Sequence, residues 1–158
     1  MHAISVQPYL DALGARTPAP ASGSGAAVTG AIGAALAELA ARFSDEREAA
    51  SRLVELRTRL VELADEDADA YTAFMRTRSA EDRDRTIDVP LAIAEAASEA
   101  ASLARVLVEG GNPRVAGDAE AGFELARAAS RVGARLVEIN LDGADDPRLD
   151  RARAASVG

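Results

Sequence analysis

The chain has 158 residues, of which 48% are hydrophobic and only 3% aromatic, and its formal net charge is -8. This length suits one domain, residues 1–158, around one core, and the acidic balance without a basic stripe argues against a nucleic-acid partner. There is no cysteine, which excludes disulfides, thiolate nucleophiles and cysteine-ligated zinc. The single histidine, His2, lies at the N-terminus, so we expect no metal site.

Targeting signals are not visible in the sequence. The first residues lack a basic segment followed by an apolar stretch, and no apolar run approaches the roughly 20 residues that cross a bilayer. The sequence predicts a cytoplasmic protein without a membrane partner.

Alanine supplies much of the apolar content, and it favours closely packed helices, whereas sheets favour β-branched and aromatic residues. The sequence therefore predicts an all-α, single-domain bundle of about five to six helices. Ser44 and Ser79 are expected as N-caps, and Pro90 predicts a kink or a new start inside the fourth helix. The expected helices cover 6–15, about 21–43, 46–77, 79–108, 118–139 and 148–156.

The spacing of apolar residues predicts the inward face of three helices. Gly30 and Gly33 lie within the second helix, and glycine costs about 1 kcal/mol in a helix interior, so this pair predicts a place where another backbone comes very close. The predicted faces consist of Val28, Ile32, Leu36, Leu39 and Phe43 in the second helix; Leu53, Leu56, Leu60, Leu63, Asp67, Tyr71 and Phe74 in the third; and Gly122, Leu125, Ala129, Val132 and Leu136 in the fifth.

Asp67 is the exception on these faces, because leucine or alanine would be expected at its position. A buried, unpaired carboxylate is costly, so it must be paired, hydrogen-bonded or protonated. Desolvation would raise its pKa into a range useful for general acid/base catalysis. The alternative is a structural aspartate that fixes a neighbouring helix end.

The segment 20–25 contains small residues and opens the second helix. The first amide groups of a helix have no partner within it and bind anions or polar ligand edges. The alternative is an ordinary turn in which Ser22 or Ser24 is the N-cap. Two further polar sites are candidates for ligand binding: Asn112 with Asp118, and Asn140. For each of them the alternative is a local capping role.

Five segments, in order along the chain, resemble the family of formiminotetrahydrofolate cyclodeaminases and methenyltetrahydrofolate cyclohydrolases. The ordered set is more specific than any one segment. Its members are Thr17-Pro18-Ala19-Pro20 with the small residues after it, resembling TPAPGGGSAAALAGALGAAL; residues 63–71, resembling L-x-D-x-D-A-x-A-F/Y; Val89-Pro90-Leu91, resembling V-P-L; Gly111-Asn112 with Gly117-Asp118, resembling G-N…S-D; and Ile139-Asn140-Leu141, resembling I-N-L.

The resemblance implies a helical enzyme without a tightly bound cofactor, whose substrate is a tetrahydrofolate derivative. Family members expel ammonia from 5-formiminotetrahydrofolate or hydrolyse 5,10-methenyltetrahydrofolate. By resemblance, Asp67 is the leading acid/base candidate, with Asp65 beside it. The implied substrate-binding residues are Ser22, Gly23, Ser24, Gly25, Asn112, Asp118 and Asn140.

Three departures from the family pattern leave other functions open. The triple glycine is Ala21-Ser22-Gly23, the serine of the S-D pair is Gly117, and the stretch between Tyr71 and Pro90 is shorter by roughly four helical turns. The alternatives are a diverged homologue acting on another small molecule in specialised metabolism, or a non-catalytic helical dimer module. A homodimer is expected in each case, because alanine-rich faces bury little area per residue.

Overall fold

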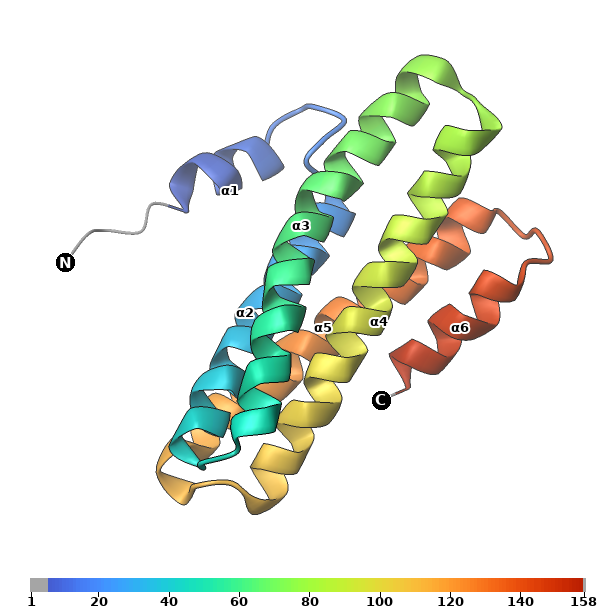
Figure 1. The fold of residues 1–158 in the computed structure, drawn as a ribbon. Helices are drawn as coiled ribbons and strands as arrows, with labels where there is room; N and C mark the ends of the chain where they lie inside the picture. The colour runs from blue at the N-terminus through green and yellow to red at the C-terminus, as the bar shows by residue number, and fades with distance from the viewer. Residues whose placement is uncertain (1–5, 158) are drawn as a thin grey trace.

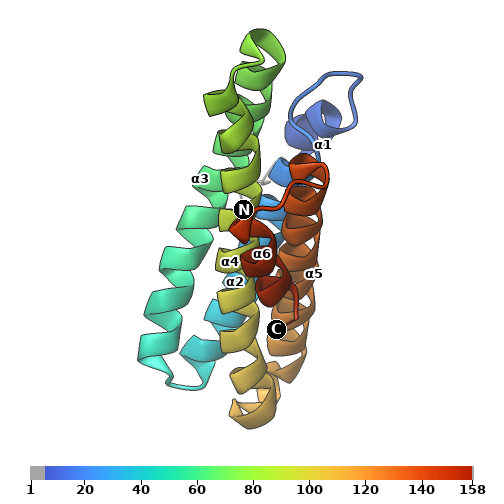
Figure 2. The ribbon, with the colours of Figure 1, turned by 90° about the vertical axis from the view of Figure 1, so that its right-hand side faces the viewer.

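The computed structural model describes residues 6–157, and every regular element in that range is helical (Figure 1). Helices α2 to α5 run up and down as an antiparallel bundle, α6 packs on α4 and α5, and α1 lies beside the end where α2 begins (Figures 1 and 2). The predicted all-α fold is confirmed, and His2 lies outside the described residues. The elements are α1 Gln7–Leu13, α2 Ser22–Phe43, α3 Arg47–Thr77, α4 Ala80–Gly110, the 3-10 turn η1 Pro113–Val115, α5 Ala116–Leu141 and α6 Pro147–Ser156.

The helix ends agree with the sequence pattern at one N-cap and differ at another. The Ser79 hydroxyl accepts a hydrogen bond from the Asp82 amide, as predicted for the start of α4. The prediction for Ser44 is wrong, because Glu46 occupies the N-cap of α3 and the Ser44 hydroxyl donates to the carbonyl of Ala40. Helix α4 continues through Pro90 without a new start.

The predicted inward face of α2 is wrong, because the small residues face the core instead. Ile32 is 51% exposed and Phe43 is 61% exposed. Gly33 is buried, and a Cβ placed on it would lie 2.7 Å from the Ala126 amide nitrogen and 2.8 Å from the Gly122 carbonyl oxygen. The predicted close backbone approach at Gly33 is confirmed, and it leaves no room for larger residues between α2 and α5.

Helix α5 also places small residues against α2. Gly122 and Ala129 are buried against α2, but Val132 is 41% exposed and Leu136 is only partly buried. The predicted face is therefore correct in its small residues and wrong in its large ones. Ile32, Leu39 and Phe43 of α2 and Val132 of α5 remain exposed on the outside of the bundle, whereas Val137 and Leu141 of α5 are buried.

Helix α2 is the one described helix long and apolar enough to cross a membrane by length and composition. The sequence analysis did not anticipate such a helix. Here 56% of the apolar stretch is buried inside the protein, where α2 contacts α3, α4 and α5. This is the burial expected of the central helix of a bundle.

The α3–α4 hairpin extends beyond the ends of α2 and α5 (Figures 1 and 2). The leucines of α3, such as Leu60 and Leu63, are fully buried by α2 and α4. Tyr71 and Phe74 continue the same face into the extension, where Tyr71 is 41% exposed and Phe74 is half-buried. The predicted inward face of α3 therefore ends as an uncovered aromatic surface.

Candidate functional site

The start of α2 is capped by a carboxylate from another helix. Asp67 Oδ2 accepts a hydrogen bond of 2.9 Å from the amide of Ser24, in the first turn of α2. The N-cap residue is Ala21, and no side chain caps the helix locally. The alternative in which Ser22 or Ser24 is the N-cap is therefore wrong, and Asp67 provides the negative charge that a helix N-terminus favours.

Gly23 makes this arrangement possible. A Cβ on Gly23 would lie 2.1 Å from Asp67 Oδ1 and 2.5 Å from Oδ2, far inside van der Waals contact. The carboxylate therefore rests directly on the backbone of the first turn. Glycine is required here for the close approach of a side chain rather than for an unusual backbone angle.

Burial of Asp67 raises the pKa of its carboxyl above the ordinary value, although the Ser24 amide hydrogen bond lowers it in part. Desolvation is the larger effect, because it penalises the charged form. No arginine forms a salt bridge with Asp67 among residues 6–157 to offset it. The result is a carboxylate with a higher proton affinity than an exposed aspartate, as a general base at neutral pH requires.

Helix α1 supplies a further polar group that the sequence analysis missed. The Tyr9 hydroxyl lies 3.0 Å from Ser24 Oγ, and Ser24 is 2% exposed. The amide and the hydroxyl of Ser24 therefore link Asp67 to α1. Leu13 of α1 also lies beside Gly25. No local motif could have revealed Tyr9, because its partner is 15 residues away in the sequence.

A groove of about 480 Å³ lies between the α3–α4 extension and the end of α5, and we call it the hairpin groove. It lies on the aromatic end of the face that carries Asp67, since Tyr71 follows one helical turn later. Asn140 is at its wall and donates a hydrogen bond of 2.6 Å to the Thr86 carbonyl. Its lining residues are Tyr71, Phe74, Arg78, Arg83, Thr86, Ile139, Asn140 and Asp142. A volume of this size suits a small-molecule ligand.

The structure brings only some of the predicted site residues together. Gly23, Ser24 and Asp67 are in contact, whereas Asp65 is exposed. Ser22 is exposed at the start of the same helix, and Gly25 is half-buried beside α1.

Asn112 and Asp118 do not lie in one cleft with Asp67 in this chain. The Asn112 amide side chain donates to the carbonyl of Phe43, at the far end of α2. That end is about 28 Å from Ser24 at 1.5 Å per residue. Asn112 also caps η1 through the Arg114 amide. Asn112 therefore has a local structural role as the N-cap of η1, and its predicted contact with substrate stays a prediction.

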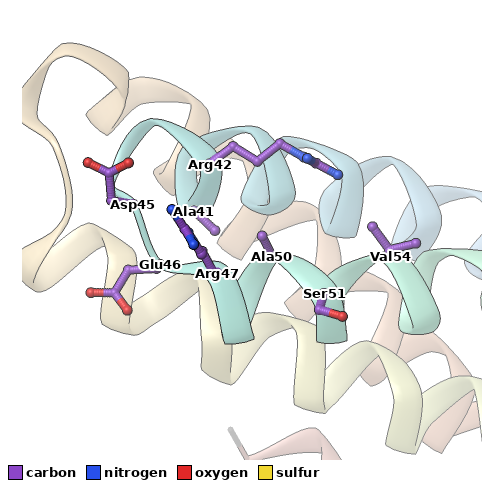
Figure 3. Close-up of a pocket in the computed structure, with 8 residues that line it drawn as sticks. All are labelled: Ala41, Arg42, Asp45, Glu46, Arg47, Ala50, Ser51 and Val54. Atoms are coloured by element: carbon purple, nitrogen blue, oxygen red, sulfur yellow. The ribbon is translucent and has the colours of Figure 1, made fainter.

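A second groove, of about 470 Å³, lies at this far end, beside the α2–α3 turn (Figure 3). Asp45, Glu46 and Arg47 around it are exposed, and Arg42 is paired with Glu38. The groove contains none of the predicted site residues and no buried ionisable group. We therefore place the candidate site at the Asp67 end. Within residues 6–157, no three His, Cys, Asp or Glu side chains are grouped so that they could hold a metal ion.

Comparisons with known proteins agree with one another. A family model described as formiminotransferase-cyclodeaminase matches residues 5–157. The methenyltetrahydrofolate cyclohydrolase of Methylorubrum extorquens is 28% identical over 169 residues, covering 90% of this chain and 81% of that protein. The crystal structure of formiminotetrahydrofolate cyclodeaminase from Thermotoga maritima matches with a TM-score of 0.88 and 24% identity, covering 99% of this chain and 91% of that one. These two chains share a fold.

Proposed function

Because the chain belongs to the formiminotransferase-cyclodeaminase family, we propose that it is an enzyme of one-carbon folate chemistry acting on a tetrahydrofolate derivative. The observation that supports catalysis is the half-buried Asp67 carboxylate, whose pKa is raised and which has a helix N-terminus on one side. The aromatic surface one turn further along α3 offers space for a flat ring. No tightly bound cofactor is needed for this chemistry.

The first candidate reaction is hydrolysis of 5,10-methenyltetrahydrofolate, the activity named for the Methylorubrum relative. Water would add to the methenyl carbon while Asp67 takes one of its protons. The bond from that carbon to N5 would then break, N5 would receive a proton, and the formyl group would remain on N10. One proton is released overall. A base with a raised pKa suits the removal of a proton from water.

The second candidate reaction is ammonia elimination from 5-formiminotetrahydrofolate, which is favoured by the match to the Thermotoga cyclodeaminase fold. N10 would attack the carbon of the protonated formimino group. Asp67 would take the proton from N10 and return it to the departing nitrogen, which leaves as ammonia. Both reactions require one group that first accepts and then donates a proton, so the same carboxylate serves either.

Turnover of the two substrates by the purified protein tests the proposal. We expect one of them to be consumed, and we expect Asp67→Asn to lower kcat/KM by about 100- to 10,000-fold, the contribution of a general base. Asp69→Asn, an exposed neighbour on the same helix, is the matched control and should retain activity. Turnover of neither substrate would favour the diverged or non-catalytic alternatives. Full activity of Asp67→Asn would remove Asp67 from the mechanism.

We further propose that the protein is a cytoplasmic homodimer in which the outer face of α2 is covered by a second copy. The face contains large apolar residues, of which Ile32, Leu39 and Phe43 are exposed, and Glu38 and Arg42 flank it; its members are Val28, Ile32, Leu36, Leu39 and Phe43. Surfaces of this kind mark protein interfaces. Sedimentation should give a dimer that Leu39→Asp dissociates. Val106→Asp, at a 67% exposed site on α4, should leave the dimer intact. A wild-type monomer would contradict the dimer.

A further inference from the structure

Two of the seven arginines that have no salt bridge among residues 6–157 lie on the rim of the hairpin groove. Eleven of the eighteen arginines form salt bridges with carboxylates. Arg78 and Arg83 have no such partner among residues 6–157, although the chain is acidic overall. Both line the groove that holds Tyr71 and Phe74. Their positive charge is therefore available to a ligand.

Local structure accounts for Arg78 but not for Arg83. Arg78 follows the last turn of α3, where a cation is favoured by the helix dipole, but Arg83 lies near the start of α4, where a cation is disfavoured. The Arg78 guanidinium lies 5.1 Å from the centre of the Phe74 ring, which holds it beside the aromatic surface. Asp142, which is exposed, is the one acidic residue that lines the groove. Two arginines against one carboxylate leave the rim positive.

We propose that Arg78 and Arg83 bind the carboxylates of the substrate's glutamate tail. This inference rests on the proposed function, because it takes the substrate to be a folate. Arg78 lies about 16 Å beyond Asp67 along α3, at 1.5 Å per residue. The aminobenzoyl ring of a folate would pass along the aromatic surface between them, and the tail would reach the rim. Guanidinium groups bind carboxylates through paired, charge-assisted hydrogen bonds.

The inference predicts that binding affinity depends on the glutamate tail of the ligand rather than on its ring system. Equilibrium binding of 5-formyltetrahydrofolate is compared with that of 5-formyltetrahydropteroate, which lacks glutamate. The wild-type protein should bind the glutamylated ligand about tenfold or more tightly than the pteroate. The Arg78→Gln/Arg83→Gln protein should lose this difference and bind the pteroate with unchanged affinity. Its melting temperature should fall only slightly, because neither arginine forms a salt bridge within the described chain and the exposed contact of Arg78 with Phe74 contributes no more than about 1 kcal/mol.

Arg114→Gln is the matched control, since Arg114 is an exposed arginine without a salt bridge among residues 6–157, at the opposite end of the bundle. It should bind both ligands as the wild type does. Equal binding of the two ligands by the wild type would overturn the arginine subsite alone. An equal loss for both ligands in the double variant would overturn it as well. Binding of neither ligand by the wild type would overturn the proposed function and this inference with it.

Discussion

Each end of the bundle has a cluster of polar residues: Ser44 and Asn112 at the far end, and Ser24 and Asp67 at the near end. The two clusters differ in the groups that form their hydrogen bonds. At the far end, the Ser44 hydroxyl accepts from the Asn112 amide and donates to Ala40, and the Asn112 side chain donates to Phe43. Every one of these partners is neutral. At the near end, where α2 begins, the half-buried carboxylate of Asp67 lies against a helix start with one hydrogen bond from Ser24.

This difference is the basis on which we propose a structural role for the Asn112 cluster and a chemical role for the Asp67 cluster. A neutral network lowers the free energy of the fold and has no proton to exchange near neutral pH. A desolvated carboxylate costs stability, and it is retained where its proton affinity is useful. We therefore propose that the Asn112 end contributes stability and that the Asp67 end contributes chemistry.

The largest expected effect comes from filling the space that Asp67 occupies. Gly23→Ala places a methyl group where the carboxylate now lies, so Asp67 must move off the Ser24 amide. We expect kcat/KM to fall about 100-fold or more, as for a displaced catalytic base. Gly117→Ala, in the first turn of α5 with nothing within 4 Å of the new methyl group, should keep its activity and gain up to about 1 kcal/mol of stability. Equal activities in the two variants would show that the Gly23 contact is dispensable.

The next largest effect is a loss of stability, and it is expected at the far end of the bundle, where Asn112 lies. Asn112→Ala removes the hydrogen bond to Phe43 and the cap on η1, so we expect a loss of about 1–2 kcal/mol in the free energy of unfolding. The melting temperature should drop by several degrees. The kcat of the folded variant should match that of the wild type. A loss of activity at an unchanged melting temperature would show that the far end contributes to a site, and the comparison would fail.

A smaller and opposite effect on stability is expected at Asp67. Its pKa is raised in the folded state from an ordinary value of 3.8, so the folded chain binds its proton more tightly than the unfolded chain does. Stability from this group is therefore present below pH 3.8 and is lost as the pH rises through the raised value. Asp67→Asn should melt at or above the wild-type temperature at neutral pH, and the difference should shrink in acid. Thermal melts across pH check this, and a variant that melts lower at neutral pH would contradict it.

Much of the fold could be predicted because local sequence determines it. Alanine content and prolines indicate the helices and their ends, the pair Gly30 and Gly33 predicts the close approach to α5, and the position of Asp67 on an apolar helix face identified the carboxylate that contacts Ser24. The inward face of α2 was assigned to the wrong side for a physical reason, whereas the α5 face was correct at Gly122 and Ala129 and wrong at Val132. Hydrophobic periodicity finds an apolar stripe but cannot tell a core face from an outward one. Here glycine and alanine occupy the core, and the larger side chains of α2 face outward.

The rest of the candidate site depends on contacts between distant segments. Tyr9 meets Ser24 only because α1 folds back beside α2, and Arg78 and Arg83 share a groove only because α3 and α4 extend beyond their neighbours. The placement of Asn112 near the substrate came from the order of motifs along the chain. Order does not give distance: Asn112 follows α4 at the end of the bundle opposite Asp67, whereas Asn140, later in the chain, lies toward the Asp67 end.

The smallest effect is expected where α1 contacts the near end. Tyr9→Phe removes one hydrogen bond between two neutral hydroxyls, Tyr9 and Ser24, and leaves the aromatic ring in place. Such a bond contributes about 1 kcal/mol, so kcat/KM should fall only a few-fold through looser positioning of the first turn of α2. Gln7→Leu, which breaks an exposed hydrogen bond within α1, is the control and should have no effect on activity. A loss in Tyr9→Phe as large as that of Gly23→Ala would mean that the tyrosine hydroxyl itself touches the substrate, and the near end would then have a second catalytic group.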